Sequence, residues 1–326
     1  MAEPVSPSWL LAERSARYDE AKHGQRPINV WEASLRYCKL ACGTEMPALG
    51  LGTWRMGESA RRRTAEVAAV RNALNIGYRL IDTAEMYGEG GAETVVGTAL
   101  GDAMRAGDVR REELFVVSKV YPHNASRKGT LQACDRSRAR LDLDQIDMYL
   151  LHWRGQHPLR ETCSAMQQLV AEKRIGHWGV SNFDTADMIE LLAVQRELGI
   201  AQDSVAGCAT NQVYYSLRAR APEASLLPWM RSHRMPLIAY SPIDQGALAG
   251  EPALRPMAKR LGISVAQLAL AWVMAQNAVA AIPKSVRDAH LRENFAAAQL
   301  TLCASDLAEL DRRFPAPPGK TPLTVL

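Results

Sequence analysis

Residues 115–120 read F-V-V-S-K-V and residues 148–153 read M-Y-L-L-H-W, and a stretch with helical spacing at residues 126–141 separates them. Both runs are apolar at consecutive positions, which is typical of strands that are covered on both faces. Two strands that a helix of this length connects must be parallel, because only a crossover helix returns the chain to the same end of the sheet. This stretch therefore predicts a strand–helix–strand unit with parallel strands.

The same unit recurs along the chain. Further short apolar runs occur at residues 49–54, 79–84, 177–181, 209–213, 236–241 and 279–284, with helical spacing at residues 64–76, 159–171 and 186–198. Eight such runs in roughly 250 residues are the number that a TIM barrel requires. A doubly wound sheet usually has a G-x-G-x-x-G motif after its first strand, and neither Gly50-Leu51-Gly52 nor Gly88-Glu89-Gly90 continues into that motif. We therefore predict an α/β protein with a (β/α)8 barrel.

The residues before the first unit differ from the rest. Residues 34–46 alternate and turn at Gly43, which predicts a short hairpin. Residues 1–34 show no periodic element, and we treat them as an N-terminal extension of unknown role. No internal linker interrupts the later repeats, so we expect residues 35–326 to form a single domain.

Composition and charge exclude several classes of function. Of the 326 residues, 47% are hydrophobic and 23% are charged, which is typical of a globular protein rather than a disordered one. The formal net charge of +4 is not concentrated in a basic tract, so neither nucleic acid nor a membrane surface is an expected partner. Residues 261–283 carry no charge, but Gln267, Gln276 and Asn277 interrupt them, which favours a buried helix followed by a buried strand over a membrane span.

Cysteine and histidine spacing gives no sign of a metal centre. The six cysteines are scattered without C-x-x-C pairs, which in a chain of this length indicates reduced, mostly buried thiols and a cytoplasmic location. The histidines His123, His157, His177 and His233 have no ligand spacing with one another or with carboxylates, so we expect no metal.

Polar side chains stand at the ends of three successive predicted strands. They are Asp82, Lys119 and His152, and each shares a strand face with an apolar residue two positions earlier. The carboxyl-terminal ends of barrel strands carry the chemistry of TIM barrels. Neighbouring strands are roughly 4.8 Å apart, so the three side chains can converge within about 10 Å. Tyr87, on a glycine-containing loop after Asp82, can fold back over them.

A purely structural explanation of these residues remains open. Asp82 and Lys119 could form a buried ion pair and His152 could be a core histidine, although buried pairs contribute little to stability because desolvation cancels most of the Coulomb attraction. Four titratable groups at the functional end of a barrel favour chemistry instead. A phenol has a pKa of about 10, and a neighbouring ammonium such as Lys119, held charged by Asp82, is expected to lower the pKa of Tyr87. With His152 orienting a carbonyl oxygen, the set predicts a general acid that protonates an alkoxide as hydride arrives.

Several segments carry a strong resemblance to a known family. In order they are G-L-G-T-W (50–54), G-Y-R-L-I-D-T-A-E-M-Y-G (77–88), V-S-K-V (117–120), L-L-H-W (150–153), R-I-G-H-W-G-V-S-N-F (174–183), N-Q-V-Y (211–214), A-Y-S-P-I (239–243) and I-P-K-S (282–285). Over about residues 36–314 the chain resembles the aldo-keto reductase superfamily. It looks most like bacterial members described as methylglyoxal reductases, through C-A-T-N-Q (208–212) and P-A-P-P-G-K-T (315–321).

The resemblance implies a (β/α)8 barrel that uses NADPH to reduce aldehydes and some ketones to alcohols. It implies that Tyr87 is the general acid, that Lys119 and Asp82 tune its pKa, and that His152 orients the carbonyl. The side chains that it places around the substrate are Trp54, Tyr87, His152 and Trp153. Small reactive aldehydes such as methylglyoxal are the expected substrates, and we expect a monomer.

The same resemblance implies a site for the coenzyme. Tyr240 would stack on the nicotinamide and Ser181, Asn182 and Gln212 would bind its carboxamide, although Tyr240 could also be a core aromatic and Ser181-Asn182 a helix N-cap. Lys284 and Ser285 would bind the 2′-phosphate, next to the N-terminus of a helix predicted at residues 288–295, where anions are favoured. The other expected contacts are Gly52, Thr53, Trp54, Asp82, Ser241, Pro242, Ile243, Gln245, His290, Glu293 and Asn294.

One position departs from the family pattern. His290 stands where the family usually has arginine, and a histidine that is largely neutral at pH 7 cannot clamp a phosphate through two parallel hydrogen bonds. Arg287 either compensates or is a solvated surface charge. NADPH is the expected coenzyme, with NADH possible.

Two other classes of function stay open. Some barrels of this superfamily resemble channel-associated subunits, which predicts a nucleotide-binding barrel with little turnover that acts as a regulatory or binding subunit. An isomerase or lyase that uses Lys119 as a Schiff-base amine is disfavoured, because Asp82 would keep that amine protonated.

Overall fold

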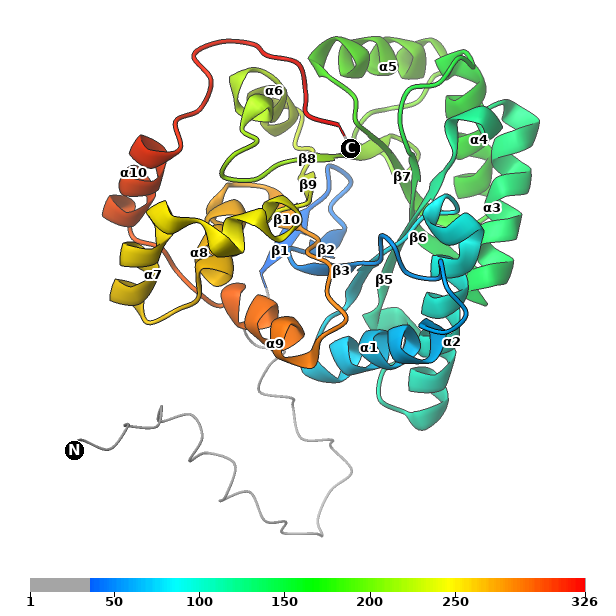
Figure 1. Cartoon of the computed structure of the whole chain (residues 1–326). Coiled ribbons are helices and arrows are strands. Elements are labelled where there is room, and N and C mark those ends of the chain that lie inside the picture. Colours follow the sequence, from blue (N-terminus) through cyan, green and yellow to red (C-terminus); the bar gives the residue numbers. More distant parts are fainter. Residues whose placement is uncertain (1–35, 326) are drawn as a thin grey trace, which may run out of the picture. The chain divides into compact units, whose positions relative to one another are not determined.

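The apolar runs form eight parallel strands in one sheet, in a computed structural model that describes residues 36–325 (Figure 1). The N-terminal extension predicted for residues 1–34 lies outside the described residues. In chain order the strands are β3 (Gly50–Gly52), β4 (Leu80–Asp82), β5 (Phe115–Val120), β6 (Ile146–Leu151), β7 (Ile175–Ser181), β8 (Cys208–Tyr214), β9 (Leu237–Tyr240) and β10 (Val279–Ala281). Each strand pairs with its neighbour in sequence.

The first and last strands also meet. Leu49 and Ala281 form a parallel bridge, and the amide of Gly52 donates to the carbonyl of Pro283 at 3.1 Å. The sheet therefore closes into the (β/α)8 barrel that the sequence predicted.

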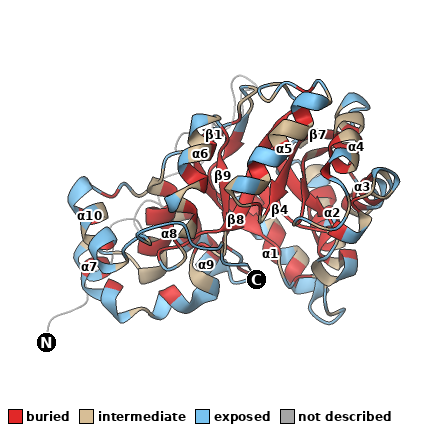
Figure 2. Cartoon of the chain, turned by 90° about the horizontal axis from the view of Figure 1, so that it is seen from above, coloured by how far each residue is buried: buried red, intermediate tan, exposed pale blue. Residues whose placement is uncertain are grey.

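Helices surround the strands and bury one face against them (Figures 1 and 2). They are α1 (Arg63–Ile76), α2 (Gly91–Ala106), α3 (Arg127–Leu141), α4 (Leu159–Ala171), α5 (Thr185–Glu197), α6 (Leu226–Ser232), α7 (Arg255–Leu261), α8 (Val265–Ala275), α9 (Asp288–Ala297) and α10 (Ala304–Arg313). The predicted helix starts are correct to within one residue. Ser126 is the N-cap of α3 rather than its first residue, because its hydroxyl accepts from the amide of Gly129.

The predicted hairpin is also present, as β1 (Tyr37–Lys39) and β2 (Glu45–Pro47), which pair antiparallel. Its side chains Cys38, Leu40 and Met46 join the inward-facing side chains of the strands in one buried cluster inside the barrel. A larger cluster fills the space between the strands and the helices. The hairpin therefore extends the core into the barrel interior, and its turn residue Cys42 lies 3.8 Å from His177, near the start of β7.

The uncharged stretch at residues 261–283 contains α8 and then β10, as predicted. Among the described residues, no helix combines the length and the apolar character that crossing a membrane would require. All six cysteines fall within the described residues and are free, and four of them are buried.

Candidate active site

The ends of β4 and β5 place Asp82 and Lys119 side by side within the barrel. In the register of the sheet, Asp82 lies opposite Gly52 on one side and Val117 on the other, and Lys119 lies opposite Leu150. Leu80, Val117 and Leu150 belong to the inner cluster, so the strand alternation turns Asp82 and Lys119 inward as well. Both side chains are almost completely buried.

The ammonium group of Lys119 has three oxygen neighbours. Its Nζ donates to Asp82 Oδ1 at 2.7 Å, to the carbonyl of Thr83 at 2.9 Å and to the hydroxyl of Tyr87 at 3.3 Å. The other oxygen of Asp82 accepts from Gln212 Nε2 at 2.7 Å. The structure thus brings the predicted acid, ammonium and carboxylate into one hydrogen-bonded chain.

His152 completes this group from the next strand. β6 ends at Leu151, so His152 and Trp153 lie just beyond the strand. The predicted run at residues 148–153 had placed both of them within it. The His152 ring meets the Tyr87 ring edge-on, with 5.6 Å between the ring centroids, and lies 5.0 Å from the Trp153 ring. Its Nδ1 is buried and has no hydrogen-bond partner among the described residues.

Burial shifts the pKa values of Tyr87, His152 and Lys119, and the shift of Tyr87 is opposite to the one that the sequence predicted. Lys119 was expected to lower the pKa of Tyr87, and this expectation is wrong. Burial raises the pKa of Tyr87 well above its usual value, and the Asp82 carboxylate acts in the same direction. The reason is that burial removes the phenol from water, which disfavours its charged form.

The pKa values of His152 and Lys119 are shifted in the opposite direction, to lower values. Burial, with the charge of Lys119, lowers the pKa of His152 well below its usual value, so its ring is neutral at pH 7. Burial also lowers the pKa of Lys119, and the contact with Asp82 opposes that shift. The site therefore combines a protonated phenol, Tyr87, with a neutral imidazole, His152.

A pocket of about 710 Å³ opens over these residues and extends to α9. It is lined by almost all of the residues that the sequence had assigned to coenzyme or substrate, namely Gly52, Trp54, Asp82, Tyr87, His152, Trp153, Ser181, Asn182, Gln212, Tyr240, Ser241, Pro242, Ile243, Gln245, Lys284, Ser285, His290, Glu293 and Asn294. Lys119 lies beneath Asp82 and Tyr87 and does not line it. Thr53 does not line it either, because its amide and its hydroxyl both donate to the carbonyl of Asp82, at 3.0 and 2.9 Å.

One wall of the pocket is built from polar side chains at the ends of β7, β8 and β9. Ser181 Oγ donates to the carbonyl of Gln212 at 2.7 Å. Asn182 accepts from the Tyr240 hydroxyl at 2.9 Å and donates to the carbonyl of His152 at 3.3 Å. The alternative that Ser181 and Asn182 cap the next helix is wrong, since Asp184 is the N-cap of α5.

The far end of the pocket is formed by the segment between β10 and α9 and by the first turns of α8 and α9. Lys284 and Ser285 lie there with His290, Glu293 and Asn294 of α9. Arg287 is exposed and does not line the pocket, which agrees with a solvated surface charge. Sequence reasoning missed Ser264, Val265 and Ala266 at the start of α8, whose only signal is a capping box, and Arg55 and Met86, which adjoin the predicted Trp54 and Tyr87.

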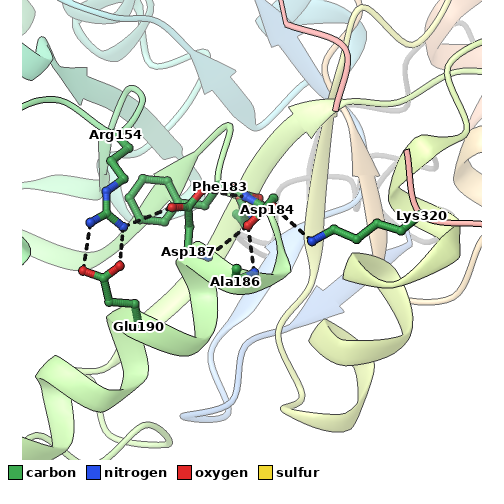
Figure 3. Close-up of polar contacts among 8 residues, drawn as sticks. Arg154, Phe183, Asp184, Ala186, Asp187, Glu190 and Lys320 are labelled. Carbon is green, nitrogen blue, oxygen red and sulfur yellow. Dashed lines mark hydrogen bonds and ion pairs between the residues drawn. The ribbon is translucent and has the colours of Figure 1, made fainter. Parts of the chain in front are cut away.

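Ion pairs connect the loops that follow β6 and β7 to α5 and to the C-terminal tail (Figure 3). Arg154, which follows Trp153, forms two hydrogen bonds with Glu190 of α5, at 2.7 and 2.8 Å, and contacts Asp187 at 3.0 Å. Asp184 accepts from Lys320 of the C-terminal tail at 3.2 Å. The start of α5 therefore joins the loop after β6, the loop after β7 and the C-terminal tail.

The fold and the site together define the class of protein. The chain belongs to the aldo/keto reductase family, whose model matches residues 48–313.

Individual relatives are similar over nearly their whole length. The chain is 46% identical to methylglyoxal reductase YeaE of Escherichia coli over 86% of this chain and 95% of the relative. It is 33% identical to glyoxal reductase of Bacillus subtilis, over 84% of this chain and 91% of the relative. A solved aldo-keto reductase from Klebsiella pneumoniae in complex with NADPH is 44% identical and superimposes with a TM-score of 0.80, over 90% of this chain and 99% of that one. Another structure from the same organism, in complex with NADP and acetate, has a TM-score of 0.81 and 44% identity, over 89% of this chain and 99% of that one.

Proposed function

We propose that the protein reduces aldehydes and some ketones to alcohols with NADPH, and that Tyr87 donates the proton. The observation that carries the proposal is the position of the Tyr87 hydroxyl. Tyr87 lines the pocket, and its hydroxyl lies 3.3 Å from the ammonium of a fully buried lysine that Asp82 holds at 2.7 Å. A buried ion pair contributes little to stability, so its place directly under a phenol in a pocket favours a chemical role.

The shifted pKa values suit a proton donor that acts only once hydride has reached the substrate carbonyl. Tyr87 keeps its proton at neutral pH, because burial raises its pKa. Bound NADPH would supply the hydride that converts the substrate carbonyl into an alkoxide. An alkoxide is a much stronger base than a phenolate, so Tyr87 can then give up its proton, and the Lys119 ammonium stabilises the phenolate that remains. Neutral His152, whose ring lies beside that of Tyr87, would hold the carbonyl oxygen by a hydrogen bond.

The pocket fits a dinucleotide. Its volume of about 710 Å³ is within the range of about 300–1,000 Å³ that is usual for ligand sites. Tyr240 and Asn182 would take the nicotinamide end near Asp82. Lys284, whose pKa burial lowers, would meet the 2′-phosphate, and the N-terminal turn of α9 favours an anion there. The solved relatives with NADPH and NADP support this assignment. His290 in place of arginine predicts that NADH is also accepted.

The relatives and the pocket support small reactive aldehydes such as methylglyoxal as substrates. Trp54 and Trp153 line the pocket together with Tyr87 and His152 and would form the apolar wall around the substrate. A cytoplasmic location and a monomeric state remain predictions that accompany this function.

The test is the variant Tyr87→Phe, with Tyr37→Phe as the control. Tyr37 is a half-exposed phenol on the hairpin and is not among the residues that line the pocket. The rate of methylglyoxal reduction, followed by NADPH absorbance, should fall by about 10²–10⁴-fold in Tyr87→Phe and stay at the parent rate in the control. Binding of NADPH, followed by fluorescence, should be equal in all three proteins. Equal rates in Tyr87→Phe and the parent would contradict the proposal, and a parent that binds NADPH without turnover would favour a binding subunit.

A further inference from the structure

The segment that carries Tyr87 pairs with none of the strands between residues 36 and 325. Tyr87 begins a short turn, Tyr87–Gly90, in which Gly88, Glu89 and Gly90 all have positive φ angles, of 57°, 53° and 87°. The position of the phenol therefore depends on the packing of Gly88 against the backbone of residues 56–58 and on side-chain contacts on either side of the turn. Two buried carboxylates, Glu85 and Glu93, bracket Tyr87 at the two ends of this segment.

Glu93 ties the far end of the segment to the strand of Lys119. It lies in the first turn of α2 and is fully buried. One of its oxygens accepts from Ser118 Oγ at 2.5 Å, and the other accepts from Arg140 Nε at 2.6 Å. Ser118 precedes Lys119 on β5, so this contact joins the first turn of α2 directly to the strand that carries the ammonium.

Arg140 also fixes the turn itself. A Cβ added at Gly90 would lie 2.5 Å from Arg140 Nε and 2.7 Å from its Cδ, so the arginine packs directly against the turn backbone. Glu93 holds Arg140 in that position through their ion pair. Loss of the Glu93 charge would therefore release the arginine as well as the serine contact.

Glu85 ties the near end of the segment to the residues that follow Lys119. Its Oε1 accepts from the amide of Tyr121 at 2.7 Å and from Asn124 Nδ2 at 3.0 Å, and its Oε2 lies 3.4 Å from Arg136. Its own amide donates to the carbonyl of Lys119 at 3.4 Å. The Tyr87 segment is thus joined to β5 and its continuation on both sides of Lys119.

We propose that Glu93 and Glu85 are positioning residues that hold the Tyr87 hydroxyl against the Lys119 ammonium. Neither lines the pocket, so both would act through Tyr87 and not by contact with substrate or coenzyme. This inference rests on the proposed function, since it assigns a role in the proton transfer from Tyr87. A displacement of about 1 Å at a reacting group can lower a rate by about 100-fold, so even a small movement of the turn matters.

The experiment compares Glu93→Gln with a matched control, Asp147→Asn. Asp147 is also a partly buried carboxylate beside an arginine, 2.8 Å from Arg111, and it contacts the start of β5 through the amide of Val116 at 2.8 Å. Like Glu93, it is a carboxylate that pairs with an arginine and accepts a hydrogen bond from β5, but its contact is at the opposite end of that strand. With methylglyoxal and NADPH, Glu93→Gln should lower kcat by about 10- to 100-fold with little change in the KM for NADPH, whereas Asp147→Asn should keep the parent kcat.

A double variant separates positioning from a general loss of structure. In a Tyr87→Phe background, Glu93→Gln should change the residual rate by less than about twofold, because residues that act through one another are not additive. A full additional loss in that background, or a parent kcat in Glu93→Gln, would overturn the inference. If Glu93→Gln does not fold, Ser118→Ala removes one contact of the same carboxylate, and an unchanged kcat in that variant would overturn it too.

The outcomes also separate this inference from the proposed function. A parent protein that does not oxidise NADPH with methylglyoxal or other aldehydes contradicts the proposed function and, with it, the role of Glu93. An active parent that loses its activity in Tyr87→Phe but not in Glu93→Gln contradicts only the positioning role.

Discussion

Replacement of Lys119 by methionine, which has a similar length but no charge, is expected to destabilise the protein strongly. Lys119 is fully buried, and its Nζ lies 2.7 Å from Asp82 Oδ1. Without it, the Gln212 amide is the one polar side chain in the described part of the chain that still bonds to the Asp82 carboxylate. Removal of one partner of a buried pair costs about 3–5 kcal/mol of the free energy of unfolding.

The reciprocal variant Asp82→Asn is expected to cost less. It leaves Lys119 with the carbonyl of Thr83 and the hydroxyl of Tyr87. Burial already lowers the pKa of Lys119, so an unpaired lysine can lose its proton and avoid part of the cost of a buried charge. In Lys119→Met the Asp82 carboxylate keeps the Gln212 amide as a hydrogen-bond donor but loses the cation with which it pairs.

The double variant Asp82→Asn/Lys119→Met should recover most of the lost stability, because replacement of a whole buried ion pair by neutral groups is often neutral. Unfolding in urea, followed by tryptophan fluorescence, gives the free energy for the parent and all three variants. We expect the double variant to be at least about 2 kcal/mol more stable than the sum of the single losses implies, and to be inactive in carbonyl reduction. Additive losses would show that the pair stabilises the fold in its own right and would refute the reasoning.

Two other predictions concern single groups of the pocket. The pKa of His152 is lower in the folded protein than in the unfolded chain, so the folded state binds fewer protons and stability should fall as the pH falls below about 6.5, by up to about 1.4 kcal/mol per pH unit from this residue. His152→Gln should reduce that slope between pH 7 and pH 5 in urea titrations, and an unchanged slope would contradict the lowered pKa. Lys284→Ala should raise the KM for NADPH by about 10- to 100-fold, the value of a hydrogen bond to a charged group, and should change the KM for NADH little. Steady-state kinetics with both coenzymes measure this difference, and equal effects on the two would place the 2′-phosphate elsewhere.

The barrel could be predicted from the sequence because its signal is repeated. Each of the eight apolar runs corresponds to an observed strand, since a parallel strand that is buried on both faces needs consecutive apolar residues. The strand bounds differ from the predicted runs: the run at residues 49–54 extends beyond β3 (Gly50–Gly52) on both sides. Trp54 could not be recognised as lying outside the strand, because an aromatic residue at the rim of a pocket has the same hydrophobic character as one within a strand.

The pocket was predicted where residues belong to motifs and missed where they only adjoin it in space. Ser264 and Val265 line the pocket because α8 begins beside α9, which is a consequence of barrel closure and not of a local pattern. Thr53 shows the opposite case. It stands within a recognised motif, yet both of its donors point to the backbone of Asp82, so its neighbours in the sequence reach the pocket and it does not.

The pKa of Tyr87 could not be predicted from the sequence because it depends first on burial, which a sequence pattern does not measure. A sequence pattern indicates that an ammonium and a phenol meet at strand ends, and the contact of 3.3 Å agrees with this. It does not indicate how completely the whole group is removed from water. Because burial dominates, the phenol is a weaker acid than it is in water. Catalysis at this site would therefore depend less on an acidified phenol than on how accurately the turn at Tyr87–Gly90 holds it against Lys119, and for this reason the carboxylates on either side of that turn matter.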